Sequence, residues 1–490
     1  MSELVAANEN QRDSCIVIPG DHDKVEMEEG IREKVGKTGG TRVVCRSGSP
    51  IDPVDLEIAN PQEARSIIVL PPETGDADTH TIKTILVLTN SPTRRKEPYH
   101  IVAEIRDPKN MEAARLVARD EAQLVLAGDL ISRITAQSCR QSGLSIVYTE
   151  LLDFGGDEIY MQEEPGLVGK TFREALFAYE DSAVIGLRFA GGRVRLNPPM
   201  DTRLAARDRV IAVSEDDDTV RLSTRPAPSV DDSAIRPSPA RKRAPENTPI
   251  LGWNRRAPVI IRELDAYVPP RSTATVVSDS AEAQTMLQEA GARLRNQKVS
   301  FRAGDTTQRA LLESLEVRRF SHIIVLGASD ALEIQEADAH TLVTLLHLRD
   351  MAERGGFSLS IVSEMLDVRN RELAEVTRAD DFIVSDKLVS LMLSQISENR
   401  DLAAVFQDLF DPEGSEIYIR PASDYVEPGK SVSFYTVLEA AKRRGEVALG
   451  YRLSAKAGEE ASSYGVVVNP GKSVPVTFSE QDRVIVLAEA

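Results

Sequence analysis

The chain of 490 residues contains the same succession of segments twice. Each match is short, but the order is the same in both halves, and chance matches would not stay collinear over such a length. The matching segments are 65–70 and 321–326, 101–107 and 361–367, 156–160 and 414–418, 197–198 and 469–470, and 208–212 and 482–486. A repeat of this length predicts that one structural unit occurs twice along the chain.

Short apolar segments alternate with helical patterns inside each half. The predicted strands of the second half lie at 249–253, 273–278, 298–304, 322–327, 358–364 and 381–386. Segments with helical periodicity separate them, at 255–266, 281–290, 306–316, 335–354 and 387–399. Near-continuous apolar strands separated by helices are typical of a parallel, doubly wound α/β sheet. After about residue 412, short strands, Gly-Pro turns and one helix at 434–444 predict a small α+β lobe.

A polar segment separates the two copies. Residues 224–248 are rich in Pro, Ser and charged side chains, which cannot bury a core, so we predict a linker whose basic cluster at 241–243 is solvated. The predicted parts of the chain are an N-lobe at 1–145 and a small C-lobe at 146–223 in repeat one, the linker at 224–248, and in repeat two an N-lobe at 249–400 and a connecting helix with a C-lobe at 401–490.

The first copy begins later in its sheet than the second. Residues 15–20 correspond to the second strand of the other copy, at 273–278. Residues 1–13 are poor in β-branched side chains and do not suit a strand. A parallel sheet without a central strand leaves unpaired backbone groups on its neighbours. We therefore expect the first N-lobe to lack its first strand and to be the less stable of the two N-lobes.

Composition narrows the possible partners and locations. A net charge of -18 argues against nucleic acid, because neutralising phosphates requires clustered Lys and Arg. Cys15, Cys45 and Cys139 lie far apart, which indicates reduced thiols rather than a zinc site or disulfides. The sequence has no apolar run of 18 residues and no secretory signal. We therefore expect the chain as given to be cytoplasmic.

Two segments carry a family resemblance. Residues 250–268, with their Gly-Trp-Asn turn, and residues 41–70, with Arg-Ser-Gly, resemble the Castor/Pollux-type ion channels, and each half more broadly resembles an RCK/KTN domain. The resemblance implies two tandem RCK-like units, each a doubly wound parallel Rossmann-like sheet plus a small α+β C-lobe. It also implies self-association into a dimer or gating ring, and a membrane pore domain supplied upstream in the same chain or by another chain. The full-length protein would then lie at the cytosolic face of a membrane.

The resemblance favours a regulatory module over an enzyme. We expect the cytosolic ligand-sensing gating-ring module of a cation channel or potassium-transport system, and the alternative is an NAD(P)-dependent oxidoreductase. A dinucleotide-binding turn reads GxGxxG, whereas Gly252 is the one glycine of the turn here and is followed by Trp253 and Asn254. The sequence contains no GxSxG, HExxH or P-loop motif, so we predict no enzymatic activity.

A doubly wound sheet binds ligands at the carboxyl ends of its strands. Here Arg255 and Arg256 have two possible partners, a phosphate or a neighbouring carboxylate, and Asp279 suits either a ribose or a helix N-cap. The candidate ligand-binding residues at these strand ends are Gly252, Trp253, Asn254, Arg255, Arg256, Asp279, Arg302, Gly304, Asp305, Gly327, Ser329 and Glu364, with Arg46, Gly48 and Glu104 in the first half. The structural alternative is a pair of ion pairs, Arg302 with Glu364 and Arg46 with Glu104.

Carboxylates near the same strand ends are candidate metal ligands. Calcium requires several hard oxygen ligands, and no EF-hand loop occurs, so a site would have to be assembled by folding. The candidate metal ligands are Glu104 with Asp107, and Glu364 with Asp367. The ligand stays open between Ca²⁺ and a nucleotide such as NAD or ATP.

Two predicted helices carry more apolar positions than one sheet face covers. These apolar positions are Leu342, Leu345, Leu346, Leu391, Leu393 and Ile396. Exposed apolar positions on a helix favour burial against another molecule. This pattern predicts self-association of the chain.

Overall fold

The computed structural model describes residues 1–11, 13–72, 75–224, 229–238, 244–375, 381–410 and 414–489. They form two compact units. Unit 1 comprises Met1–Gly128, Leu152–Gly155 and Val389–Ala403, and unit 2 comprises Asp129–Leu151, Gly156–Leu388 and Ala404–Ala490. The basic cluster predicted at 241–243 lies outside the described residues.

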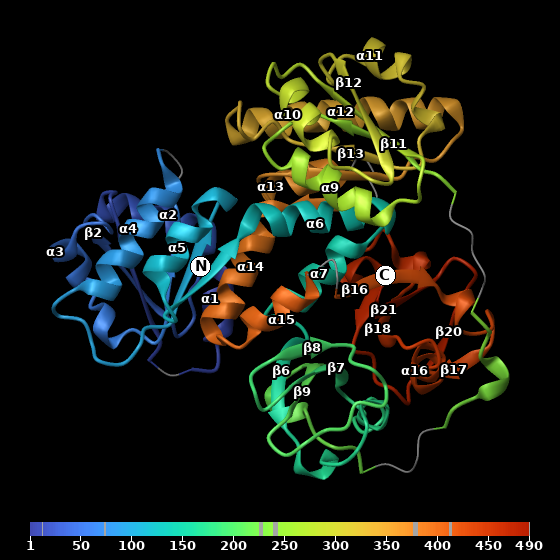
Figure 1. Cartoon of the computed structure of the whole chain (residues 1–490), viewed down its shortest axis with the longest axis horizontal. Helices are drawn as coiled ribbons and strands as arrows, with labels where there is room; N and C mark the ends of the chain where they lie inside the picture. Colours follow the sequence, from blue (N-terminus) through green and yellow to red (C-terminus); the bar gives the residue numbers. More distant parts are fainter. Residues whose placement is uncertain are drawn as a thin grey trace. The chain divides into compact units, whose positions relative to one another are not determined.

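The second N-lobe, in unit 2, is built on a six-stranded parallel sheet with the order β12-β11-β10-β13-β14-β15 (Figure 1). Its strands are β10 (Asn247–Leu251), β11 (Ser272–Ser278), β12 (Gln297–Ala303), β13 (Ile323–Val325), β14 (Ile361–Met365) and β15 (Asp381–Val384). Successive strands are added on one side of β10 up to β12 and on its other side from β13 onward, which is the arrangement of a doubly wound fold. The predicted α/β class with a parallel sheet is confirmed.

Helices follow the strands of the second N-lobe. They are α9 (Ala257–Tyr267), α10 (Ala283–Gly291), α11 (Arg309–Ser314), α12 (Ile334–Gly355), α13 (Arg369–Glu375) and the start of α14 (Ser385–Glu398). Helix α12 buries Thr341, Leu345, Leu348 and Ala352, which are spaced by three or four residues and therefore share one face. Leu345 and Leu348 join the core cluster of Leu251, Val277, Ile323 and Val325.

The first N-lobe, in unit 1, has a divided sheet. Among the described residues, strand β1 (Cys15–Gly20) pairs in parallel with β2 (Arg42–Ser47) alone. Strands β3 (Ile67–Val69), β4 (Ile101–Ile105) and β5 (Ala122–Leu126) form a separate three-stranded parallel sheet. In the second N-lobe β10 joins the counterparts of β1 and β3, whereas among the described residues of unit 1 no strand does so. Leu70, after β3, is 65% exposed, and its counterpart Leu326 is 4% exposed.

The helices of the first N-lobe follow the same succession. They are α1 (Ser2–Ala7), α2 (Lys24–Val35), α3 (Pro53–Glu57), α4 (Ala77–Asn90) and α5 (Met111–Ala118). A core cluster forms between α4, β4 and neighbouring segments, and it contains Ile85, Leu88, Tyr99, Ile101 and Ala103. Helix α1 lies within residues 1–13, the segment that was predicted not to form a strand.

The two C-lobes, both in unit 2, have four-stranded antiparallel sheets with the same order, β6-β9-β7-β8 and β16-β21-β18-β19. The bounds are β6 (Glu158–Glu163), α8 (Phe172–Ala175), β7 (Ala183–Arg188), β8 (Val194–Leu196) and β9 (Arg209–Ser214), then β16 (Ser415–Pro421), β17 (Ser431–Ser433), α16 (Phe434–Lys442), β18 (Val447–Arg452), β19 (Val466–Val468), β20 (Pro475–Thr477) and β21 (Arg483–Glu489). Strands β7 and β18 each carry a bulge before a glycine, Gly186 and Gly450. A Cβ there would lie 2.6 and 2.0 Å from the carbonyl oxygens of Arg195 and Val467, so both positions require glycine.

The connecting helices α6 (Ala127–Arg140), α7 (Leu144–Leu152), α14 and α15 (Leu402–Leu409) each contact residues from the opposite half of the chain. In unit 2, α6 pairs Arg140 with Glu246, at 2.8 Å, beside the second N-lobe. In unit 1, Glu398 at the end of α14 forms an ion pair with Arg65 of the first N-lobe. These helices are therefore exchanged between the two copies of the repeat.

Candidate functional site

The turn after β10 is shaped by a contact with β13. Gly252 has a φ of 93°, and a Cβ on it would lie 2.2 Å from the carbonyl oxygen of Leu326. The Gly252 amide donates to the carbonyl of Val277 at 2.9 Å, and the Leu326 amide donates to Leu251 at 2.8 Å. The glycine is needed for this close backbone approach, and the neighbouring Trp253 is buried. The turn is therefore not the glycine cradle of a pyrophosphate.

Side chains of the protein fill the crevice beside this turn. Asn254 Nδ2 donates to Gly327 O and to Glu364 Oε2, both at 2.8 Å. Arg256 forms an ion pair with Glu364, and Ser385 Oγ donates to the same carboxylate at 2.8 Å. Glu364 is 1% exposed. A buried carboxylate at this place repels a phosphate and already pairs with the arginine, so the second crevice does not suit a dinucleotide.

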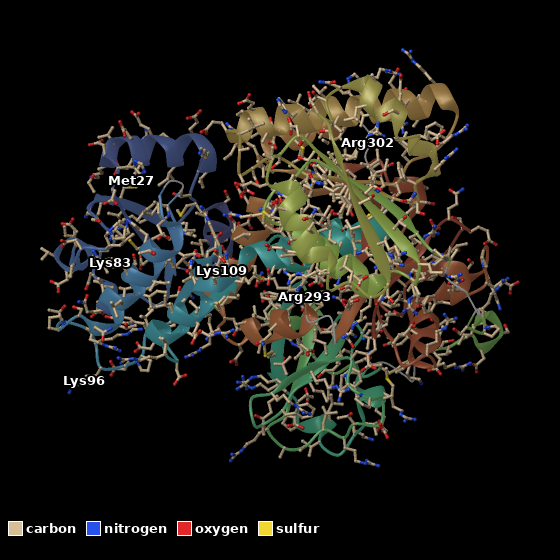
Figure 2. All side chains as sticks on the ribbon, turned by 45° about the horizontal axis from the view of Figure 1, so that its top comes forward. Met27, Lys83, Lys96, Lys109, Arg293 and Arg302 are labelled. Atoms are coloured by element: carbon tan, nitrogen blue, oxygen red, sulfur yellow. The ribbon has the colours of Figure 1, made fainter. Side chains whose placement is uncertain are left out.

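The predicted ion pairs of Arg302 with Glu364 and of Arg46 with Glu104 are wrong. Arg302, labelled in Figure 2, donates to Ser314, while Arg46 donates to the Cys45 carbonyl at 3.0 Å. In the second sheet β12 and β14 are four strand spacings apart, which amounts to about 19 Å, so Arg302 cannot reach Glu364. Glu104 lies 3.6 Å from Arg106 instead.

The other candidate residues have local structural contacts. Asp279 is exposed, and the helix that it was predicted to cap begins at Ala283 with Glu282 at its N-cap, so that prediction is wrong. The Asp330 carboxylate accepts the Arg255 amide. Asp305 accepts the amide and hydroxyl of Thr307, at 2.9 and 2.7 Å, and the hydroxyl bond lowers its pKa.

Three small candidate residues lie in turns of the same strand ends. A Cβ on Gly304 would lie 2.7 Å from Leu311 Cδ2, and one on Gly48 would lie 3.1 Å from Asp55 Cβ. Both glycines therefore make room for the helix that follows their strand. Ser329 lies in the turn after β13.

The candidate metal ligands are engaged in other contacts. The Asp107 carboxylate accepts the Lys109 amide at 2.9 Å at the start of a short 3-10 helix. Asp367 accepts the Arg369 amide at 2.9 Å and pairs with the Arg369 guanidinium, which lowers the pKa of Asp367 to about 2. Within the described ranges no group of three or more His, Cys, Asp or Glu side chains suits a metal ion.

The sequence analysis missed two buried aspartates that occupy equivalent places. Asp338, on α12, accepts the amides of Leu366 and Asp367 at 2.9 and 3.0 Å and the Asn370 side chain at 2.7 Å. Asp78, on α4, accepts the equivalent amides of Arg106 and Asp107 at 2.8 and 2.9 Å, and Asn110 at 2.8 Å. Each carboxylate ties a helix to the end of the next strand. The Asp-x-His spacing at 78–80 and 338–340 was the available signal.

Replacing Asp338 with alanine is expected to lower the free energy of unfolding of the second N-lobe by about 1–3 kcal/mol, because two buried amides lose their acceptor. Urea titration followed by the fluorescence of Trp253, the single tryptophan, measures the loss. The exposed Glu336 on the same helix provides the control, and its alanine variant should lose less than about 1 kcal/mol. Equal losses in both variants would contradict a specific role for Asp338.

Comparison with known proteins identifies the relatives of the chain. A family model described as "Castor and Pollux, part of voltage-gated ion channel" matches residues 128–231. The ion channel CASTOR of Lotus japonicus is 32% identical, with all of this chain and 60% of the relative covered. The probable ion channel POLLUX of Arabidopsis thaliana is 31% identical, with all of this chain and 63% of the relative covered. The chain therefore spans about three fifths of the length of these relatives.

One solved structure has a similar fold. The human SLO3 gating ring covers the whole chain and 97% of its own length, with a TM-score of 0.69 and 14% identity. None of the described helices is long and apolar enough to cross a membrane. The relatives found over the whole chain are named as ion channels, which agrees with the prediction that the chain is not an enzyme. Over its whole length the chain is similar to members of the Castor and Pollux ion channel family.

Proposed function

We propose that the chain is the ligand-sensing regulatory module of a cation channel, placed at the cytosolic face of the membrane. The observation that carries this proposal is the similarity of the whole chain to proteins named as ion channels. Two tandem RCK-like units, at 1–223 and 249–490, pass a change in lobe arrangement to a membrane pore. Such coupling requires the ligand to bind the two arrangements with different affinity.

We propose that the module self-associates into a ring. The gating-ring fold of SLO3 supports this arrangement. Of the six apolar positions singled out in the sequence, Leu345, Leu391, Leu393 and Ile396 are buried, while Leu346 on α12 is 51% exposed. Its counterpart on α4, Leu86, is also exposed. Matching exposed leucines on the two copies of this helix are suited to contacts between subunits.

The second crevice is an unsuitable ligand site, because Glu364, Arg256 and Asn254 fill it. Two of these residues, Asn254 and Arg256, follow β10, whereas Glu364 lies on β14. Among the described residues the first N-lobe has no strand in the position of β10. We therefore propose that the regulatory ligand, Ca²⁺ or a nucleotide, binds outside the second crevice.

A chimeric channel tests the proposed function. The matching region of Lotus japonicus CASTOR would be replaced by this chain, and currents would be recorded from the chimera. A current that changes with Ca²⁺ or nucleotide supports the proposal. A chimera that reaches the membrane and conducts with no response to any of these ligands contradicts it.

A ligand screen on the chain itself complements the chimera. At about 100 times its dissociation constant, a ligand that binds only the folded protein stabilises it by about 2.7 kcal/mol. A rise in melting temperature with Ca²⁺, NAD(H) or ATP identifies the ligand. The oxidoreductase alternative predicts stabilisation by NAD(H) together with hydride transfer, and the filled turn at Gly252 argues against it.

A further inference from the structure

Residues 229–238 lie against the second C-lobe, although the sequence analysis placed them in a linker. We call this segment the strap. It contains a short 3-10 helix, η5 (Asp232–Ala234), which lies beside β17 and α16 (Figure 1). Ile235, the next residue along the chain, forms an antiparallel bridge with Val426. The strap is therefore bound to a surface of the lobe.

Main-chain hydrogen bonds hold the C-terminal half of the strap. The Arg236 amide donates to Tyr425 O, and the Glu427 amide donates to Ala234 O, both at 2.9 Å. Ala234 is 1% exposed. Extended peptides that add to a strand edge are recognised in the same way, by main-chain hydrogen bonds together with pockets for alternate side chains. The second C-lobe therefore binds the strap as it would bind a separate peptide.

Charges hold the N-terminal half of the strap. Asp231 Oδ2 lies 2.7 Å from Lys430 Nζ, and Asp232 forms an ion pair with Arg443. Lys430 Nζ also donates to Ser233 Oγ at 2.6 Å. The hydrogen bond from Lys430 lowers the pKa of Asp231 to about 2, so this carboxylate is charged at neutral pH. The lobe therefore presents two cations to two consecutive acidic residues.

The turn before β18 gives this surface much of its charge. It contains Arg443 and Arg444, and Arg444 donates to a carbonyl oxygen of the strap at 3.2 Å. Strand β7 has the place of β18 in the first C-lobe, and the turn before it contains Glu180 and Asp181 instead. Carbonyl oxygens of that turn accept Lys472 Nζ of the second C-lobe at 2.7–3.1 Å. The equivalent turn therefore holds a cation and does not suit an acidic segment.

The contacts of the strap are weak enough for the strap to be displaced. The side chains of Asp232 and Arg443 are 73% and 47% exposed, and ion pairs as exposed as this contribute little to stability. Ala234 is the one buried residue of the strap, and its side chain is a single methyl group. Segments with few buried apolar contacts open locally while the rest of the fold persists. The strap can therefore leave its surface without unfolding the lobe.

We propose that the second C-lobe has a binding site for an acidic extended peptide, which the strap occupies until an acidic segment of a partner protein displaces it. The edge at Val426 supplies main-chain hydrogen bonds, and Lys430 and Arg443 recognise consecutive carboxylates. The strap is a built-in competitor, because its attachment to the same chain gives it an effective concentration on the order of millimolar at the site. A partner therefore binds when its segment carries more negative charge or makes a longer contact.

A labelled peptide with the sequence of residues 229–238 is the probe, and the full chain is the receptor. In the double variant Asp231→Lys, Asp232→Lys the strap is repelled and the site is intact, so the peptide should bind at least about tenfold more tightly than to the wild type, where the strap competes. Adding Lys430→Glu should abolish this binding. The exposed Lys456, on the same lobe, provides the control, and adding Lys456→Glu should leave the binding unchanged.

Three results overturn the proposal: equal binding to the wild type and the double variant, no binding to the double variant at millimolar peptide, or binding that survives Lys430→Glu. Sedimentation of the wild type mixed with the double variant distinguishes another occupant. If the two chains form dimers that excess peptide separates, a second copy of the chain occupies the site, and the assignment to a partner protein is wrong.

A second measurement needs no variant. In the wild type, residues 229–238 should exchange their amide hydrogens faster when the KCl concentration rises from about 0.1 to about 1 M, because the Debye length falls from about 10 to about 3 Å. Strand β21, which pairs with two neighbours within the same lobe, should not respond to salt. Exchange of the strap that is unchanged by salt would mean that charge does not hold it, which overturns the proposal.

Discussion

Replacing Glu364 with alanine is expected to destabilise the second N-lobe by about 3–5 kcal/mol. The reason is that Arg256 stays buried without its partner carboxylate, while Asn254 and Ser385 lose an acceptor. Urea unfolding followed by the fluorescence of Trp253 measures the effect, because this tryptophan lies in the turn that holds the pair.

Two variants define what the loss means. Glu333 is exposed at the start of α12, and its alanine variant should change the free energy of unfolding by less than about 0.5 kcal/mol. Replacing Arg256 by methionine together with Glu364 by leucine removes both charges, so it should cost much less than the single alanine variant. A loss below about 1 kcal/mol for Glu364→Ala would mean that water enters the crevice, which would reopen it as a ligand site.

Backbone amides along the divided sheet are expected to exchange with solvent much faster than those of the complete sheet. Residues 15–18 and 66–70 of the first N-lobe should exchange at least tenfold faster than residues 274–278 and 322–326 of the second. In the second sheet β10 covers both neighbours, and the Leu326 amide donates to Leu251 at 2.8 Å. Strands β1 and β3 have no such neighbour among the described residues. Hydrogen exchange with mass spectrometry measures both sets in one sample.

The comparison has an internal control. Strands β4 and β5 pair in parallel, as do β14 and β15, so their amides should be protected in both lobes. If residues 15–18 and 66–70 exchange as slowly as their counterparts, another segment covers them in solution. In that case the expected weakness of the first N-lobe is wrong.

Much of the fold follows from patterns in the sequence. Helices predicted at 255–266 and 335–354 are observed as α9 and α12, shifted by one or two residues. Periodicity suffices there because one face of each helix is buried. The predicted linker was too long, because β10 begins at Asn247 and Ile235 bridges to Val426. Backbone pairing with a distant segment leaves no mark in local composition.

The site was less predictable than the fold. The sequence analysis placed Arg256 and Glu364 at the same edge of the sheet. It did not predict that the two side chains pair, because pairing depends on the order of the strands in the sheet. In the sheet order Arg302 lies four strands away from Glu364, whereas Asn254, in the turn after β10, reaches across β13 to Glu364 on β14. The contacts of Lys472 were invisible for the same reason, because its three partners are carbonyls, which every residue carries.

Met200 in the first C-lobe and Lys472 in the second occupy equivalent positions, because their carbonyls accept the amides of Arg173 and Tyr435, each at 3.0 Å. Lys472 Nζ donates to three carbonyl oxygens of the first C-lobe, whereas methionine has no amine to donate. This unequal pair shows what covalent fusion of two copies makes possible. If the C-lobes belonged to two identical chains, any lysine at this position would occur on both sides of the twofold axis. Both turns would then have to accept a buried cation. With the two copies in one chain, one copy can keep the carbonyl-lined turn while the other supplies the amine. Two copies in one chain therefore allow an interface between equivalent lobes to have a direction, with a donor side and an acceptor side.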